Sequence, residues 1–366
     1  MKRVSVMIKP SSSGCNMRCR YCFYLDVAAR RETASFGIMS EDAAADLVRN
    51  VYADLEDGDS LTLALQGGEP TIAGLPWFRN FVSLVKAQSK KITVSWALQT
   101  NALLINEEWC EFLKENCMLV GVSLDGYREA NDASRVDAAG KGTYLRIMQS
   151  VKLLRKHKVD FNILMTLTNE LARHPQLVWK EIVKQDFRFV QFTPCLGELD
   201  EEKRTPYALT PARFASFYEE IFRSWVQEFR KGNYYSIKLF DDLVNLLAKG
   251  EVNACGLVGF CGAQFVVEAD GSAYPCDFYV LDRWKLGNIR EQPLSALFES
   301  EAGNAFRVRP ADRPLCGECP YRRICGGGCR RMQASVCYRP GETDCGYRML
   351  LEKILPELQQ IAQRFR

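Results

Sequence analysis

Short apolar stretches rich in β-branched residues alternate with longer amphipathic stretches over the first 230 residues of the chain. This alternation is typical of repeated βα units, in which parallel strands are separated by helices. Six strands are predicted, each followed by a helix: Val4–Ile8, Leu61–Gln66, Ile92–Leu98, Met118–Leu124, Val159–Met165 and Arg188–Phe192. Six such units predict an α/β fold with a partial (β/α)6 barrel.

The pattern changes near residue 235, where strands shorten and Cys, Gly and Pro become frequent. We therefore expect two domains, residues 1–234 and 235–366, the second ending in a packing helix. Within it, Asp270-Gly271 predicts a type I′ hairpin between Gln264–Val267 and Ser272–Tyr274.

Composition narrows the class of protein. The 366 residues carry 48 Lys and Arg against 45 Asp and Glu, a net charge of only +3, which disfavours nucleic acid or an anionic membrane as partner. No apolar stretch is long enough for a signal-peptide core or a membrane span, so we expect a cytoplasmic protein. Disulfides are rare in that compartment, and the 15 cysteines therefore indicate metal or redox chemistry.

The first cysteine group is Cys15-x3-Cys19-x2-Cys22, in the loop after the first predicted strand. A 4Fe-4S cluster usually takes four thiolates, so three leave one iron open to an external ligand. A structural zinc site would need a fourth Cys or His, and no His lies nearby.

With an aromatic residue, Phe23, directly after it, this spacing resembles the signature of the radical S-adenosylmethionine superfamily. Gly67-Gly68-Glu69-Pro70, after the second strand, resembles the GGEP motif of the same superfamily. The resemblance implies that S-adenosylmethionine chelates the open iron and that its reductive cleavage gives a 5′-deoxyadenosyl radical. It further implies three sets of contacts with the cofactor. Gly67, Gly68 and Glu69 would hold the methionine amino group, Ser123 and Asp125 would contact the ribose, and Leu196 would lie against the adenine.

The second part of the chain holds a further series of cysteines, whose spacing resembles the SPASM domain of peptide-modifying radical enzymes. That resemblance implies two auxiliary 4Fe-4S clusters, and so three in the protein. One would be held by Cys255, Cys261, Cys276 and Cys329, and the other by Cys316, Cys319, Cys325 and Cys345. Cys337 is an alternative to Cys345 as the last ligand. Taken alone, the cysteines from Cys316 to Cys329 are also compatible with a zinc ribbon.

Longer segments, IKPSSSGCNMRCRYCFY, LQGGEPTIAGL and QFVVEADGSAYPCDFYVLDRWKLGNI, resemble the anaerobic sulfatase-maturating enzymes. The resemblance implies oxidation of a Cys or Ser, within a Cys/Ser-x-Pro-x-Arg segment of an unfolded sulfatase, to Cα-formylglycine. It also implies an external electron donor such as flavodoxin or ferredoxin. Asp277, directly after Cys276, is the expected proton acceptor, because a free Asp is ionised at pH 7. Tyr24 is a candidate substrate contact.

Two other functions stay open at this point. A related enzyme could form thioether or carbon-carbon crosslinks in another ribosomal peptide, although such enzymes often carry an amino-terminal recognition domain and only 14 residues precede Cys15. A zinc-stabilised binding protein without catalysis is the remote alternative. The chain also departs from the family pattern at Thr100-Asn101-Ala102, where Gly is expected last, and at Asn131, where His is frequent.

Overall fold

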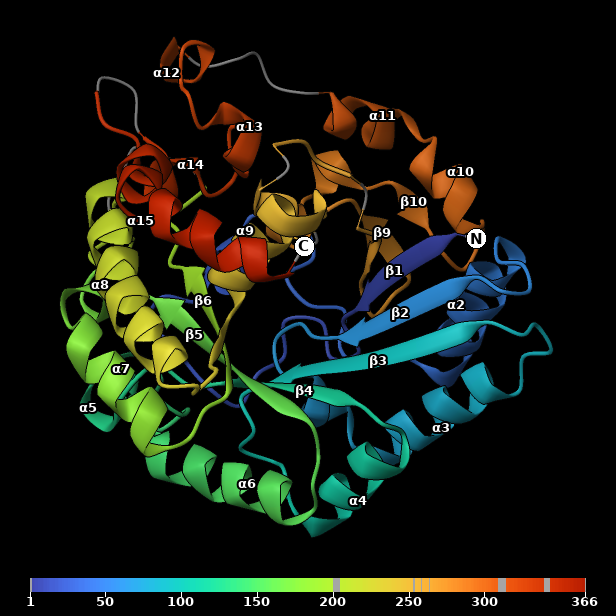
Figure 1. Cartoon of the computed structure of the whole chain (residues 1–366). Coiled ribbons are helices and arrows are strands. Elements are labelled where there is room, and N and C mark those ends of the chain that lie inside the picture. The colour runs from blue at the N-terminus through green and yellow to red at the C-terminus, as the bar shows by residue number, and fades with distance from the viewer. Residues whose placement is uncertain are drawn as a thin grey trace. The chain divides into compact units, whose positions relative to one another are not determined.

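The computed structural model in Figure 1 describes residues 2–199, 205–252, 254–257, 259–262, 264–308, 314–338 and 343–365. The chain divides into two compact units that are interleaved along the sequence. The first unit comprises Met1–Ser123, Arg135–Phe161 and Gly262–Val308, and the second comprises Leu124–Ser134, Asn162–Cys261 and Arg309–Arg366. The domain boundary expected near residue 235 is a single cut along the chain, and it stays a prediction.

Parallel strands form the centre of the first unit (Figure 1). They run in the order β1 (Arg3–Ile8), β2 (Ser60–Leu65), β3 (Thr93–Thr100) and β4 (Leu119–Ser123). In β2 every second residue is buried, because alternate side chains of a strand point to opposite faces. At the free edge of β1, the sheet continues through β8 (Val266–Val267), β9 (Ser272–Tyr274) and β10 (Gly287–Asn288).

Amphipathic helices cover these strands. Those of the first unit are α1 (Phe23–Ala29), α2 (Glu41–Ala53), α3 (Leu75–Lys86), α4 (Glu107–Glu115), α6 (Tyr144–Lys156), α10 (Leu294–Phe298) and α11 (Glu301–Arg307). Helix α2 begins where the Ser40 hydroxyl accepts a hydrogen bond from the backbone of Ala43, an N-cap worth about 1 kcal/mol. Helices α3 and α4 meet through Phe78 and Trp109, whose ring centroids lie 4.9 Å apart. These aromatic contacts bury one face of each helix.

The second unit contains three parallel strands, β5 (Phe161–Leu167), β6 (Phe189–Pro194) and β7 (Ser236–Ile237). Its helices are α5 (Arg128–Ser134), α7 (Pro175–Lys184), α8 (Pro211–Arg230), α9 (Lys238–Lys249), α12 (Pro314–Gly317), α13 (Arg322–Cys325), α14 (Gln333–Val336) and α15 (Gly346–Ala362). Helices α8 and α15 pack together through Phe214 and Tyr347, whose ring centroids lie 5.2 Å apart. Among the described residues, no helix combines the length and the apolar character that crossing a membrane requires.

All six predicted strands are present, each within two residues of its predicted bounds, and each of β1 to β6 is followed by a helix. The hairpin between β8 and β9 is also present, but the predicted type I′ turn is wrong. Gly271 has a φ of +88° whereas Asp270 is not in the left-handed region, and the Gly271 amide donates to the Glu268 carbonyl at 2.9 Å. The loop is therefore one residue longer than a type I′ turn, with a single glycine in the left-handed conformation.

Candidate active site

The loop after β1 carries the first cysteine group. Cys15, Cys19 and Cys22 are all partly exposed, and the backbone amide of Cys22 donates to the Cys19 carbonyl at 3.2 Å. Burial raises the pKa of the Cys15 thiol, and the negative charges of Glu69 and Cys22 act in the same direction. Three partly exposed thiols on one turn of chain form a donor set that fits a cluster with one open iron.

The Gly67-Gly68 segment after β2 is held tightly against this loop. The Gly68 amide donates to the Ser12 carbonyl at 2.8 Å, and the Glu69 amide donates to the Gly14 carbonyl at 2.7 Å. A Cβ on Gly68 would lie 2.1 Å from the Gly14 carbonyl oxygen, which no side chain could tolerate. Gly67, with a φ of +143°, likewise adopts a conformation that favours glycine.

The Glu69 side chain is 1% exposed, and the chain's own donors occupy both of its oxygens. Oε1 accepts hydrogen bonds from the Thr71 amide and hydroxyl and from the Thr100 hydroxyl, and Oε2 accepts one from the Asn101 amide at 2.7 Å. Burial nevertheless raises the pKa of Glu69. Glu69 therefore joins the ends of β2 and β3, and its expected contact with S-adenosylmethionine stays a prediction.

Ala102 stands where the family pattern has Gly, and this difference has a structural cost. Its φ of +62° lies in the left-handed region, where glycine is favoured and where other residues lose about 1–2 kcal/mol. Ala102 is fully buried, so its methyl group recovers about 0.8 kcal/mol of that cost. The neighbouring Asn101 side chain donates to Asn16 Oδ1 at 2.7 Å and lies 3.9 Å from Cys15 Sγ, which links the end of β3 to the first cysteine loop.

The other expected cofactor contacts lie at strand ends. Ser123 ends β4 in the first unit and is 8% exposed. In the second unit, Asp125 Oδ1 accepts a hydrogen bond from the Thr166 amide at 2.8 Å, and Asn131 Oδ1 accepts one from the Asp125 amide at 3.2 Å. Asn131 thus fixes the loop of Asp125. Leu196 follows β6 and is buried. Their contacts with the ribose and adenine stay predictions.

Asp277 lies on a one-turn helix, η4 (Asp277–Tyr279), that follows the β8–β9 hairpin. Two segments of the first unit contact its carboxylate. Lys9 Nζ lies 2.5 Å from Oδ1, and Gln66 Nε2 donates to Oδ2 at 2.7 Å. The neighbouring rings of Phe23 and Phe278 lie 5.0 Å apart, which places η4 beside the first cysteine loop. Asp277 is therefore a buried carboxylate next to the first cysteine group, and it does not cap the hairpin.

Tyr24 lies in the same region and is buried. Its hydroxyl donates to Glu268, and burial, followed by the charge of Glu268, raises its pKa well above the ordinary value. Arg31 Nη1 lies 2.7 Å from the same Glu268 oxygen. The Tyr24 hydroxyl is thus engaged within the protein, and the expected contact with substrate stays a prediction.

Three of the cysteines expected at the first auxiliary cluster gather in the second unit. Burial raises the pKa of the Cys261 thiol, and the charges of Cys329 and Cys255 act in the same direction, so the three thiols lie within electrostatic reach of one another. The backbone at Gly259 approaches the backbone at Gly326 very closely, since a Cβ on Gly259 would lie 1.6 Å from the Gly326 carbonyl oxygen. The fourth cysteine, Cys276, belongs to the first unit and directly precedes Asp277.

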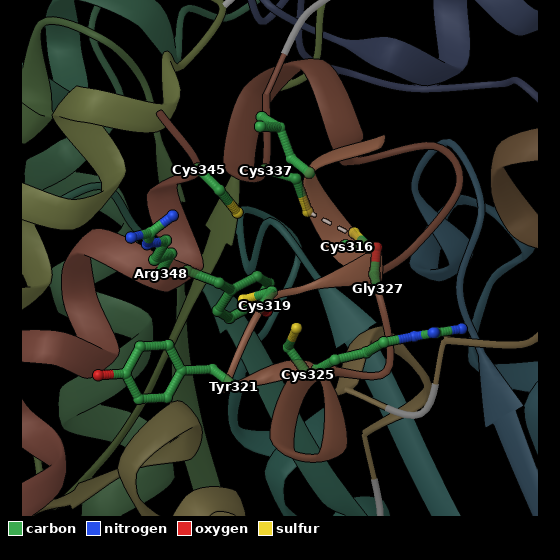
Figure 2. A pocket seen from close by; sticks show the side chains of 11 residues that line it. Cys316, Cys319, Tyr321, Cys325, Gly327, Cys337, Cys345 and Arg348 are labelled. Carbon is green, nitrogen blue, oxygen red and sulfur yellow. Dashed lines mark hydrogen bonds between the residues drawn. The ribbon is translucent and has the colours of Figure 1, made fainter. Parts of the chain in front are cut away.

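The second auxiliary group surrounds a hollow of about 350 Å³ that is partly open to solvent (Figure 2). Cys325 is buried, and its pKa is raised to about 11 by burial, with further contributions from Cys345, Cys319 and Cys316. Cys337 also lines this hollow, and its thiol donates to the Gly327 carbonyl at 3.8 Å. Cys345 as the last ligand, with Cys337 as the alternative, stays a prediction.

Glycines between Cys325 and Cys329 let the chain serve both groups of cysteines. Gly326, Gly327 and Gly328 have φ values of +57°, +92° and +74°. Residues other than glycine rarely adopt this left-handed backbone conformation. Among the described residues, no group of three or more His, Cys, Asp or Glu side chains is close enough to hold a single metal ion. In a 4Fe-4S cluster each thiolate binds a different iron, whereas all the ligands of a zinc site bind one ion.

Comparison with known proteins agrees with this geometry. Residues 10–176 match the family model described as the radical SAM superfamily, and residues 255–320 match an iron-sulfur cluster-binding domain named SPASM. A cysteine-type anaerobic sulfatase-maturating enzyme of Clostridium novyi is 42% identical over 90% of this chain and 89% of its own. A serine-type enzyme of Bacteroides thetaiotaomicron is 28% identical over 99% of this chain and 90% of its own.

A solved structure described as native anSMEcpe with bound AdoMet and Cp18Cys peptide superposes with a TM-score of 0.90 at 38% identity, covering 100% of both chains. The chain therefore belongs to the anaerobic sulfatase-maturating enzymes of the radical S-adenosylmethionine superfamily. The predicted fold class, an α/β protein with a partial (β/α)6 barrel and a SPASM domain, is confirmed, as is a radical oxidoreductase as the class of enzyme.

No role was expected for Lys9, Gln66, Thr100 and Asn101, which the structure places at this site. All four follow or end a predicted parallel strand, and the carboxyl ends of such strands are where active sites form. That position was the available signal, but it does not say which carboxylate each residue would meet.

Proposed function

We propose that this protein oxidises the cysteine of a Cys-x-Pro-x-Arg segment in an unfolded sulfatase to Cα-formylglycine. The observation that carries this proposal is the Asp277 carboxylate, held by Lys9 and Gln66 beside the first cysteine loop, in a chain 42% identical to a cysteine-type enzyme. Cysteine is favoured over serine as the target, because cysteine-type relatives are 40–42% identical and serine-type relatives 28–29%.

The donor sets fit the cofactors that the family requires. Cys15, Cys19 and Cys22 would hold the first cluster, with S-adenosylmethionine against Gly67, Gly68, Glu69, Ser123, Asp125 and Leu196. Cys255, Cys261, Cys276 and Cys329 would hold one auxiliary cluster, and Cys316, Cys319, Cys325 and Cys345 the other. When bound, these groups supply a hydrogen-abstracting radical and electron acceptors.

The chain's own residues manage the proton and the target. The target cysteine loses two electrons and two protons in all, one of each with the hydrogen atom removed from its Cβ. We assign acceptance of the thiol proton to Asp277, whose Oδ2 accepts a hydrogen bond from Gln66 and whose Oδ1 is paired with the Lys9 ammonium. The thioaldehyde left on the peptide takes up water and releases hydrogen sulfide, which gives the aldehyde.

The partners follow from this reaction. The substrate is the sulfatase polypeptide before folding, because the target side chain must reach a buried carboxylate. An external carrier such as flavodoxin or ferredoxin would supply the reducing electron. That carrier and a cytoplasmic setting stay predictions.

The proposal is tested by incubating the reconstituted protein anaerobically with S-adenosylmethionine, a reductant and peptides containing the sulfatase motif. Three peptides differ only at the target position, which is Cys, Ser or Ala. We expect the Cys peptide to become the aldehyde faster than the Ser peptide, and the Ala peptide to stay unchanged. If 5′-deoxyadenosine forms while all three masses stay constant, the substrate is another peptide and the proposal fails.

A further inference from the structure

Lys9 follows β1 directly, and its side chain is completely buried. Its backbone amide donates to the Val267 carbonyl at 2.8 Å, which holds the residue against β8. Burying an ammonium group is costly unless a partner compensates it. A buried cation at this position therefore needs an explanation, whereas a lysine on the surface would simply be solvated.

The surroundings of the Lys9 ammonium are simple. Nζ lies 2.5 Å from Asp277 Oδ1 and 3.8 Å from the centroid of the Tyr24 ring. Among the described residues, neither Lys9 Nζ nor Asp277 Oδ1 makes a hydrogen bond of good geometry, so the contact between them is an ion pair alone. The main electrostatic partner of the ammonium is thus the Asp277 carboxylate, and the ring face of Tyr24 supports it from a second direction.

The carboxylate is in turn fixed at both oxygens. Lys9, after β1, faces Oδ1, and Gln66, after β2, donates to Oδ2 at 2.7 Å. Strands β1 and β2 are neighbours in register, with Ile8 opposite Leu65. The two groups that hold Asp277 therefore project from adjacent positions of one rigid sheet, which fixes the orientation of the carboxylate plane.

We propose that Lys9 is a positioning residue, which holds the Asp277 carboxylate in the orientation needed to accept the proton of the target residue. The inference rests on the proposed function, because it presupposes that Asp277 is the proton acceptor. In this role Lys9 acts through Asp277 and not directly on the substrate. A buried ion pair often adds little to the stability of a fold, since replacing both partners with apolar residues is often tolerated. We therefore explain the Lys9–Asp277 pair by the placement of the Asp277 carboxylate and not by stability.

The test replaces Lys9 with Met, which keeps a long side chain but removes the ammonium. Displacing a catalytic group by about 1 Å lowers rates by up to about 100-fold, so we expect aldehyde formed per 5′-deoxyadenosine to fall by about 10- to 100-fold. The KM for the peptide should change little, because in this role Lys9 acts through Asp277. Lys238→Met is the matched control, since it removes the cation paired with the buried Asp242 of α9, and it should leave the ratio unchanged.

A double-mutant cycle separates positioning from general damage. If Lys9 acts through Asp277, the double variant Lys9→Met/Asp277→Asn should be no worse than Asp277→Asn alone. Multiplied effects would overturn the inference. Lys9→Gln keeps a hydrogen-bond donor and should retain more of the aldehyde yield than Lys9→Met. If Lys9→Met does not fold, Lys9→Gln takes its place, and its aldehyde yield is then compared with that of Asp277→Asn, which it should exceed.

The outcomes also separate this inference from the proposed function. If Asp277→Asn lowers the aldehyde yield and no Lys9 variant changes it, the role of Lys9 is refuted and the proposed function stands. If Asp277→Asn itself leaves the aldehyde yield intact, Asp277 is not the base, and the role of Lys9 fails with it.

Discussion

Replacing Asp277 with Asn should lower aldehyde formation by about 100-fold or more, while cleavage of S-adenosylmethionine continues. Removing a general base costs about 10²- to 10⁴-fold, because an amide cannot accept the thiol proton. Asn has nearly the same shape as Asp, and its one oxygen can face the Lys9 ammonium while Gln66 turns its amide to face the new NH2 group. The fold should therefore survive, and only the proton transfer should be lost.

The measurement is the amount of aldehyde and of 5′-deoxyadenosine formed by each protein in the same reaction. Asp282→Asn is a matched control from the next one-turn helix, where the exposed Asp282 accepts a hydrogen bond from the Glu32 amide. It should leave both products at their original amounts. An Asp277→Asn protein that makes as much aldehyde as the original would remove Asp277 from the mechanism.

The second large effect concerns the last cysteine of the hollow shown in Figure 2. Replacing Cys345 with Ala should remove the second auxiliary cluster and lower the iron content from about 12 to about 8 atoms per chain, since each cluster holds four irons. Replacing Cys337 with Ala should leave the iron content unchanged, because that thiol is buried and donates to the Gly327 carbonyl.

Iron and acid-labile sulfide, measured on anaerobically reconstituted protein, distinguish the two cysteines. Each variant serves as the control for the other, because both remove one thiol from the same hollow. If Cys337→Ala loses four irons and Cys345→Ala loses none, the ligand assignment is reversed. A loss of about four irons in both variants would show that the hollow itself, and not one ligand, has been disturbed.

The strands were predictable because their signal is local. Leu61, Leu63 and Leu65 alternate with less buried residues, and such alternation is visible in the sequence before any fold is known. The turn at Asp270-Gly271 was not predictable to the same degree. Its type depends on which carbonyl the Gly271 amide meets, and that is Glu268, which sets a longer loop than the dipeptide alone indicates.

In the site, too, local features were predictable from the sequence and contacts between distant segments were not. The first cysteine group and the Gly67-Gly68-Glu69 segment were recognisable from their spacing, because the residues of each lie close together in the chain, whereas the two auxiliary sets were assigned by resemblance. The pairing of Lys9 with Asp277 joins residues 268 positions apart, 9 and 277, and it exists only because β8 pairs with β1. A lysine after a strand is usually solvated, so nothing in the sequence around Lys9 predicts that it is buried.

The most direct test of the account uses a sulfatase-motif peptide whose target cysteine carries two deuterium atoms on Cβ. Under anaerobic turnover, we predict that the peptide becomes the aldehyde and that deuterium appears in 5′-deoxyadenosine in step with it. That result would place hydrogen removal at the target carbon of this substrate. Aldehyde formed without deuterium in 5′-deoxyadenosine, or 5′-deoxyadenosine formed beside an unchanged peptide, would contradict the account.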